Sequence, residues 1–230
     1  DTDWSFGESG TVTNTLSGET WTPLVKRDEA YSGGVLIEHA LSGKTLVFKN
    51  IIIDGNGTDA RAAASDASFA PLLGIKDSEA AVLLGNGAIF RNNHVKSATD
   101  GAASGIEVNA GSLTLDGGQI TGMRMILDAP DAGKSVTGAA VAVSSGASFN
   151  MKSGMIDENS VEVSGAVSGE VKGGAVLIAN GGSFNLSGGS IRSNMGGQGS
   201  AVCFIGQAQT TGGGVTLAGG SITGNTVHTT

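Results

Sequence analysis

Charged residues suited to ligand binding lie in the segments that separate the units of an internal repeat. Segments 57–71 and 124–139 carry side chains of both signs, and six of these are candidate ligand-binding residues: Arg61, Asp66, Arg124, Asp128, Asp131 and Lys134. Carboxylates and cations grouped on one side of a protein can bind a polar ligand through charge-assisted hydrogen bonds. Inserted segments of repeat proteins commonly form the binding face. Solvated loops carry similarly scattered charges, so both interpretations stay open here.

Catalysis by paired carboxylates finds no support on the faces of the predicted strands. A glycosidase needs two carboxylates across the scissile bond, but no outward column of the repeat brings two Asp onto neighbouring units. The columns instead place Asp157 beside Arg192 and Asp116 beside Lys152. We expect these to be cross-strand ion pairs, each worth less than about 1 kcal/mol if exposed. Carboxylates from the inter-unit segments could still meet.

Metal-binding motifs are weak throughout the sequence. The run from Asp54 to Asp59 resembles an acidic calcium loop but lacks the spacing and the bidentate Glu of an EF-hand, so we assign it to a turn. The three histidines are far apart: His39, His94 and His228. A single Cys and these scattered His residues offer no zinc site. The sequence therefore predicts no metal and no cofactor.

Cys203 stands between Val202 and Phe204 in an alternating run, so its side chain is expected to point outward. An exposed thiol can be reactive. We expect instead that the insertion at 207–211 or a partner covers this face.

An internal repeat sets the elements that must position these residues. Its anchoring isoleucines recur every 31 to 36 residues, at Ile53, Ile89, Ile120, Ile156, Ile191 and Ile222. Apolar residues stand five and seven positions before each anchor, and the residue between them varies. Alternation at period two is typical of a strand with one buried face. A Gly two positions before most anchors suits a tight bend, and an Asn three positions after most of them suits a structural ladder along the stack.

Short strands at a fixed repeat, without amphipathic helices, predict an all-β fold: a right-handed parallel β-helix, or solenoid, of about six coils. The handedness follows the rule for parallel crossovers. Residues 1–32 fall outside the repeat and are predicted to form an N-terminal cap, and 33–230 to form the solenoid as one domain. No cap follows the last motif at Asn225. We therefore expect the C-terminal edge to continue into a longer protein or an assembly.

The string Gly-Gly-Ser-Phe-Asn-Leu-Ser-Gly-Gly-Ser-Ile-Arg-Ser-Asn at 181–194 resembles the β-helical repeats of large bacterial surface proteins, which are similar to pectin-lyase-like and autotransporter-passenger solenoids. The stretch Leu-Val-Phe-Lys-Asn-Ile-Ile-Ile-Asp-Gly-Asn-Gly at 46–57 resembles the inner coils of pectin-lyase-like proteins. The resemblance covers residues 33–227 and implies the fold. It does not select an activity, because this fold hosts lyases, hydrolases, adhesins and stalks.

Composition excludes several classes of partner. The 21 acidic and 13 basic residues give a formal charge of −8, which argues against nucleic acid and other anionic partners. No run approaches the roughly 18 apolar residues of a membrane helix, so we expect no membrane insertion.

With the resemblance, these observations lead us to expect a non-catalytic binding or adhesion segment, extracellular or at a bacterial cell surface. Its inter-coil loops would engage an extracellular glycan or a host surface protein. A polysaccharide lyase or glycoside hydrolase of the pectin-lyase-like type is the alternative, and a structural stalk or spacer is the second alternative.

Overall fold

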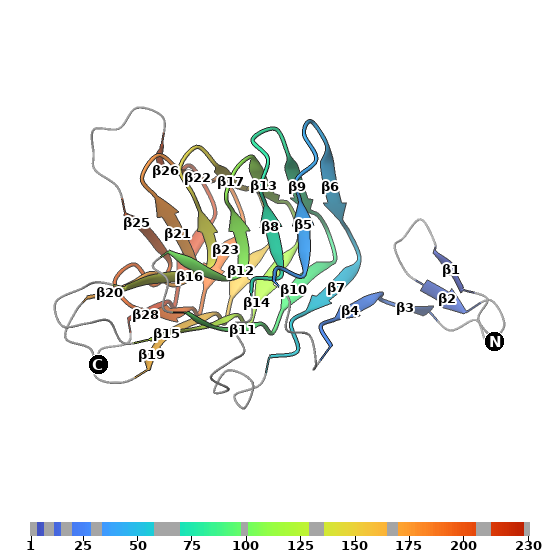
Figure 1. Cartoon of the computed structure of the whole chain (residues 1–230), viewed down its shortest axis with the longest axis horizontal. Helices are drawn as coiled ribbons and strands as arrows, with labels where there is room; N and C mark the ends of the chain where they lie inside the picture. The colour runs from blue at the N-terminus through green and yellow to red at the C-terminus, as the bar shows by residue number, and fades with distance from the viewer. Residues whose placement is uncertain are drawn as a thin grey trace.

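The structure is a computed structural model that describes residues 4–6, 12–14, 20–28, 34–57, 70–97, 101–128, 136–164, 170–205 and 213–227. These residues form strands and turns and no helix, so none of them makes a helix that could cross a membrane. The strands stack in parallel along one axis as a β-solenoid (Figure 1). The prediction of an all-β solenoid is confirmed.

Each coil passes through the sheets in a fixed order. Sheet 1 contains β5 (Ile37–His39), β8 (Leu73–Ile75), β12 (Ala102–Val108), β16 (Val136–Val143), β21 (Val176–Ala179) and β25 (Val202–Ile205), and β20 (Val171–Lys172) pairs with β16 beside this path. Sheet 2 contains β6 (Thr45–Phe48), β9 (Ala81–Leu84), β13 (Ser112–Leu115), β17 (Ser148–Met151), β22 (Ser183–Leu186) and β26 (Gly214–Leu217). Sheet 2 forms the upper row of arrows in Figure 1.

The chain then enters two further sheets before it returns to sheet 1. Sheet 3 contains β4 (Leu24–Lys26), β7 (Ile51–Asp54), β10 (Ala88–Arg91), β14 (Gln119–Thr121), β18 (Met155–Asp157), β23 (Ser190–Arg192) and β27 (Ser221–Thr223). Sheet 4 contains β11 (His94–Ser97), β15 (Arg124–Asp128), β19 (Ser160–Ser164), β24 (Met195–Gly196) and β28 (Thr226–Val227). Sheet 4 was not predicted, because its residues were assigned to loops.

The apolar columns of the repeat form the core, as predicted. In sheet 2, Leu113, Phe149 and Phe184 stand in register on successive strands and are at most 1% exposed. The rings of Phe149 and Phe184 lie 5.1 Å apart, centroid to centroid. Glycine bends connect sheet 2 to sheet 3 at Gly154 and Gly189, where φ is 92° and 87°. Because L side chains rarely adopt such angles, glycine is required at both bends.

One coil departs from the predicted alignment. The prediction that Ile89 is an inward anchor is wrong, because the register places Phe90 between Ile53 and Ile120. Phe90 is fully buried, and its ring meets Phe48 edge to face at 5.1 Å. The turn after Leu84 holds one residue more than its counterparts, so every later residue of that coil shifts by one.

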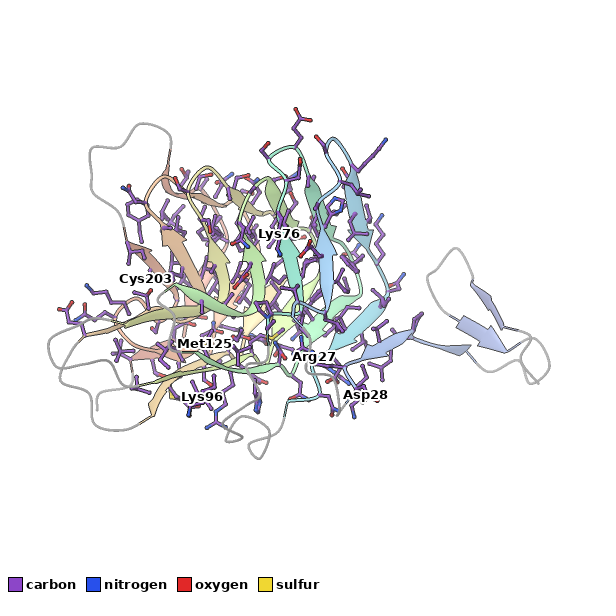
Figure 2. The ribbon with its side chains drawn as sticks, in the orientation of Figure 1. Arg27, Asp28, Lys76, Lys96, Met125 and Cys203 are labelled. Carbon is purple, nitrogen blue, oxygen red and sulfur yellow. The ribbon has the colours of Figure 1, made fainter. Side chains whose placement is uncertain are left out.

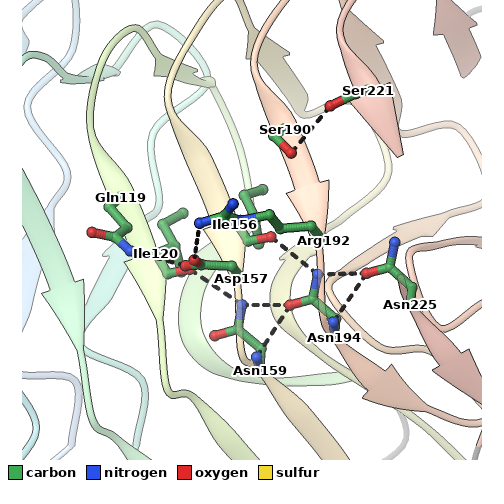
Figure 3. Close-up of polar contacts among 10 residues, drawn as sticks. All are labelled: Gln119, Ile120, Ile156, Asp157, Asn159, Ser190, Arg192, Asn194, Ser221 and Asn225. Carbon is green, nitrogen blue, oxygen red and sulfur yellow. Dashed lines mark hydrogen bonds and ion pairs between the residues drawn. The ribbon is translucent and has the colours of Figure 1, made fainter. Parts of the chain in front are cut away.

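The predicted Asn ladder is present and structural. Asn159 and Asn194 lie one above the other, and each donates its side-chain amide to a carbonyl of the preceding coil, at Ile120 (3.2 Å) and Ile156 (3.0 Å) (Figure 3). The backbone N–H of Asn159 donates to Asn194 Oδ1 at 3.1 Å, which repeats the contact between coils. In the coil that contains Phe90, the one-residue shift makes Asn93, rather than Asn92, the residue beside Met123.

Of the two predicted cross-strand ion pairs, one is confirmed. Arg192 lies 3.5 Å from Asp157, which also accepts a hydrogen bond from Gln119 at 2.9 Å (Figure 3). Asp116 instead accepts a hydrogen bond from the hydroxyl of Ser153 at 2.7 Å. The predicted pair with Lys152 is wrong.

The N-terminal residues contribute a strand to the stack. β4 pairs in parallel with β7 and begins sheet 3. The following Arg27 is 1% exposed and donates to Asn93 Oδ1 at 2.9 Å and to the carbonyls of Ala70 and Pro71. This side chain ties the segment to the second coil.

Upstream of β4, three strands form a separate antiparallel sheet: β1 (Trp4–Phe6), β2 (Val12–Asn14) and β3 (Thr20–Trp21). Figure 1 shows this sheet beside the stack, connected to it through β4. That residues 1–32 cap the solenoid, and that 33–230 form one domain, stay predictions.

Candidate binding site

The inter-coil corner, predicted to be loops, is built as a second β layer. β11, β15 and β19 of sheet 4 face the first residues of β12 and β16, together with β20, and we call these six segments the wing. The wing has its own small core, in which Val95, Met125, Leu127 and Val161 are 5% exposed or less. Figure 2 labels Met125 of this core and Lys96 of the same layer. The described parts of the segments at 93–104, 124–139 and 160–174 lie together on one side of the solenoid, but as strands.

Local sequence explains why the wing forms. Burial alternates along β15, where Met125 and Leu127 are buried and point inward, while Arg124 and Ile126 are partly exposed and point outward. Gly138 on β16 lets the two layers approach, because a Cβ there would lie 3.0 Å from Met125 Cγ and 3.2 Å from Leu127 Cδ2.

The outward face of the wing carries charged and polar side chains in register. His94, Arg124 and Ser160 form one row across β11, β15 and β19, and Lys96, Ile126 and Glu162 form the next row. Arg124 holds Glu162 through two hydrogen bonds, Nε to Oε1 at 2.9 Å and one NH2 group to Oε2 at 2.7 Å. Ser160 Oγ donates to the same carboxylate at 3.1 Å. Such two-pronged pairs fix the orientation of both side chains.

The structure describes the side chain of only one of the six predicted site residues, Arg124. Asp128 ends β15, with its Cα opposite Ser164 of β19. Arg61, Asp66, Asp131 and Lys134 lie outside the described residues. Sequence reasoning missed Glu162 as the partner of Arg124. The signal was the alternation of polar and apolar residues, which continues beyond the Asn column and predicts a fourth strand in register.

A cavity of about 590 Å³ opens at the same corner, beside the last strand of sheet 1. It is lined by Lys172, Asn180, Gln198, Gly199 and all four residues of β25. The backbone fixes its wall, because Gly173 N donates to Gln198 O at 2.8 Å and Gln198 N donates to Val171 O at 2.8 Å. Lys172 pairs with Glu170 at 2.7 Å. The ammonium of Lys172, together with Gln198, lowers the pKa of Glu170.

Cys203 points outward on β25, as predicted, but it is only 8% exposed. It packs with Ala139 and Leu177. Gly199 lies directly against it, since a Cβ on Gly199 would be 2.7 Å from Cys203 Cβ. The insertion predicted to cover it, 207–211, lies outside the described residues. Burial raises the pKa of this thiol, which makes it a poor nucleophile at neutral pH.

Asp54 stabilises a turn, as predicted. Its carboxylate accepts from the backbone N–H of Asn56 at 2.8 Å, from Arg91 Nε at 2.8 Å and from the side-chain amide of Asn92 at 3.2 Å. Among the residues that the structure describes, no three His, Cys, Asp or Glu side chains gather as metal ligands would.

The fold and this corner together define a parallel β-solenoid with a lateral β layer. Compared with known proteins, the chain matches no family model, no curated protein and no solved structure.

Proposed function

We propose that this chain is a non-catalytic binding segment of a bacterial surface or secreted protein, and that the wing engages an extracellular glycan or a host surface protein. The wing itself carries the proposal. It is a second β layer with its own core, and it adds nothing to the apolar columns that hold the coils together. The resemblance of residues 181–194 to bacterial surface solenoids supports the assignment to that class and that location.

The outward face of the wing has the chemistry of a binding surface. Arg124 and Glu162 are held in fixed orientations by their mutual hydrogen bonds. Ile126 stands in register beside Glu162, and Lys96 stands beside Ile126 on the next strand; both side chains are half-buried. A preorganised face that combines apolar and charged groups loses little conformational entropy on binding.

Three of the described carboxylates are held in ion pairs with Arg, which favours binding over catalysis at these positions. Asp54 and Asp157 are about 5% exposed, and each is paired with an Arg. Glu162 is also paired with an Arg. A general acid or base must exchange protons with the substrate, and these carboxylates would have to break their ion pairs to do so.

A binding screen with matched variants tests the proposal. The full chain is applied to a glycan array and to immobilised extracellular matrix proteins, beside Lys96→Ala/Ile126→Ala on the wing and Thr114→Ala/Asn150→Ala on the outward face of sheet 2. The wing variant is expected to weaken binding by about tenfold or more, and the sheet 2 variant to change it less than about twofold. Equal loss in both variants would contradict a site on the wing.

Turnover is measured on the same samples. The chain is incubated with acidic and neutral polysaccharides, with and without Ca²⁺, and new reducing ends and unsaturated products are followed. We expect neither product. Cleavage of any substrate would overturn the non-catalytic assignment in favour of the lyase or hydrolase alternative.

A further inference from the structure

The outward face of sheet 3 carries a charged residue on four of its five interior strands. Asp54, Arg91, Thr121, Asp157 and Arg192 stand in register on β7, β10, β14, β18 and β23, and we call these five residues the charged column. Each of these strands has a hydrogen-bonded neighbour on both sides, and the residues that flank each strand in the chain are described. The charged column belongs to the interior of the stack, so it does not depend on either end of the chain.

The two Arg side chains of the charged column keep unused hydrogen-bond donors. The Arg91 side chain is 41% exposed and reaches Asp54 through Nε alone, at 2.8 Å. The Arg192 side chain is 51% exposed and lies 3.5 Å from Asp157. Neither guanidinium makes another hydrogen bond to the described residues. Because a guanidinium has five N–H donors, each Arg can hold a second acceptor outside its own chain.

The order of charges along the charged column changes sign when the column is read backwards. From β7 to β23 the order is negative, positive, neutral, negative, positive. A two-fold axis that runs parallel to the strands and passes over Thr121 turns a second copy end to end against the first. Asp54 then faces Arg192 of the second copy, and Arg91 faces Asp157 of the second copy. Every charge of the column meets an opposite charge, and no like charges meet.

The neighbouring row of the same face is apolar where the charged column is charged. Ile52, Ile89, Gln119, Met155 and Ser190 stand in register two positions before the charged column, and all of them are partly exposed. The same axis passes over Gln119 and places Ile89 opposite Met155 of the second copy. An apolar pair beside pairs of opposite charge gives the contact both a hydrophobic and an electrostatic component.

The charge of the whole chain makes this face distinctive. With 21 acidic and 13 basic residues, the chain has a formal charge of −8, so two copies repel each other in most relative orientations. The charged column has two acidic and two basic residues and no net charge. Like charges opposite each other across an interface are strongly unfavourable. The sign-reversing order therefore favours contact with a second copy in one orientation.

We infer that sheet 3 binds the same sheet of a second copy of this chain and forms a two-fold dimer, with Thr121 of both copies at the axis. Such a contact uses one patch twice and closes at two copies. The strip is narrow, about 10 Å across and about 19 Å along the five strands, so the dimer is weak and reversible. The inference goes beyond the proposed function, because the wing binds its ligand through sheet 4.

Sedimentation equilibrium of the full chain, at concentrations up to about 1 mM, measures the dissociation constant of the dimer. Thr121→Glu and Thr121→Arg each place like charges at the axis and should raise this constant about tenfold or more. An equimolar mixture of the two variants should associate about as well as the wild type, because Glu then meets Arg. A wild type that stays monomeric, or a mixture that stays dissociated, would overturn the inference.

Matched variants on sheet 2 control for the change in net charge. Thr114→Glu and Thr114→Arg alter the outward face of β13, and each should change the dissociation constant less than about twofold. A loss of association equal to that of the Thr121 variants would place the contact on another surface and contradict the inference. Species larger than a dimer would also contradict it, because a two-fold contact closes at two copies. Circular dichroism checks that all the variants fold.

A measurement on the wild type keeps the test decisive if a Thr121 variant does not fold. In a chain labelled with ¹³C at its methionine methyl groups, the NMR signal of Met155 should shift as the concentration rises, whereas that of Met195 on sheet 4 should not. An unchanged Met155 signal while the chain sediments as a dimer would overturn the inference. Lys96→Ala/Ile126→Ala should leave the dissociation constant unchanged, so that failure of the dimer and failure of ligand binding by the wing are observed separately.

Discussion

In the interior coils of the solenoid, a core side chain has counterparts in the coils on both sides, whereas in the wing the buried side chains meet across only two layers. Ile156 stands between Ile120 and Ile191 in register, and all three are fully buried. Met125 is also fully buried, but it packs among a few residues such as Leu127 and Val161. Both cores bury apolar side chains, but those of the wing have fewer packing partners than those of the solenoid.

This difference in packing leads us to expect that the solenoid core sets global stability and that the wing is less tightly coupled to it. Stacked repeats are stabilised by their nearest-neighbour interfaces, so a defect in the solenoid core weakens the coils on both sides. A small satellite core can open locally while the rest of the chain stays folded. We therefore expect substitutions in the wing to affect binding more than global stability, and the following predictions test that contrast.

The largest effect is expected from removal of one interior side chain. Ile156→Ala should lower the free energy of unfolding by about 2–5 kcal/mol, because it leaves a cavity in a stack that cannot collapse around it. Urea denaturation followed by circular dichroism measures this change. Met125→Ala is the matched wing variant, and its main effect should be faster hydrogen exchange in 94–97, 124–128 and 160–164. An equal loss of global stability in both variants would mean that the two cores form one cooperative unit.

The next effect concerns the Asn ladder. Asn194→Ala removes the donor to the carbonyl of Ile156 and the acceptor for Asn159, and Asn194 is 1% exposed. Each buried group left without a partner costs about 1–3 kcal/mol, so a total loss of about 3 kcal/mol is expected in the same urea experiment. Asn150→Ala, on the outward face of sheet 2, should change stability by less than about 0.5 kcal/mol. A loss of about 3 kcal/mol in Asn150→Ala as well would mean that the ladder contributes no more to stability than an outward Asn does.

Within the wing, the two layers pack closely at Gly138, so a larger side chain there should push them apart. Gly138→Ala would place a methyl group 3.0 Å from Met125 and 3.2 Å from Leu127. Overpacking of this kind typically costs about 1–3 kcal/mol, and here it should appear as local opening in hydrogen exchange. Gly34→Ala is the control, since nothing lies within 4 Å of the added Cβ. Unchanged exchange in Gly138→Ala would show that the layers are not held closely together.

A smaller effect is expected for the ion pair on the wing. Arg124 and Glu162 have side chains 27% and 31% exposed, and partly exposed pairs contribute less than about 1 kcal/mol. Glu162→Gln should therefore barely change the urea midpoint, but it should reduce ligand affinity, because the charged partner that orients Arg124 is lost. High salt should reduce the difference in ligand affinity between the wild type and the variant, because it screens the charges. A large stability loss would show that this pair belongs to the scaffold.

The smallest effect on stability, but a clear chemical one, concerns Cys203. Because burial raises the pKa of its thiol, less thiolate is present at any pH below that pKa, and alkylation needs the thiolate. Modification by iodoacetamide at pH 8, followed by mass spectrometry, should be about tenfold or more slower in the native chain than in urea. It should accelerate as the pH rises. Rapid modification of the native chain would mean that the segment around Gly199 does not cover the thiol.

The periodic pattern of the chain is enough to predict the solenoid. Alternating apolar columns such as Leu113, Phe149 and Phe184 repeat at nearly constant spacing, and a periodic pattern specifies both the strand and its counterpart in the next coil. The glycine bends and the Asn ladder followed from the same periodicity. These features depend on local geometry and stacking, which a repeat encodes directly.

The register of one coil, the wing and the burial of Cys203 depend instead on contacts between distant parts of the chain. The insertion of one residue after Leu84 turned Phe90 inward, and nothing local distinguishes Phe90 from Ile89 as an apolar residue in a strand. The wing was not predicted, because the segments between the Asn column and the next coil differ in length and were assigned to loops. Each strand of sheet 4 nevertheless begins four residues after the inward residue of sheet 3, as His94 does after Phe90 and Arg124 after Ile120. The ion pair between Arg124 and Glu162 joins two strands of the wing, and the stacking of their coils sets the register of these strands. Burial of Cys203 likewise depends on Gly199, because the segment that contains Gly199 packs against β25, the strand that contains Cys203.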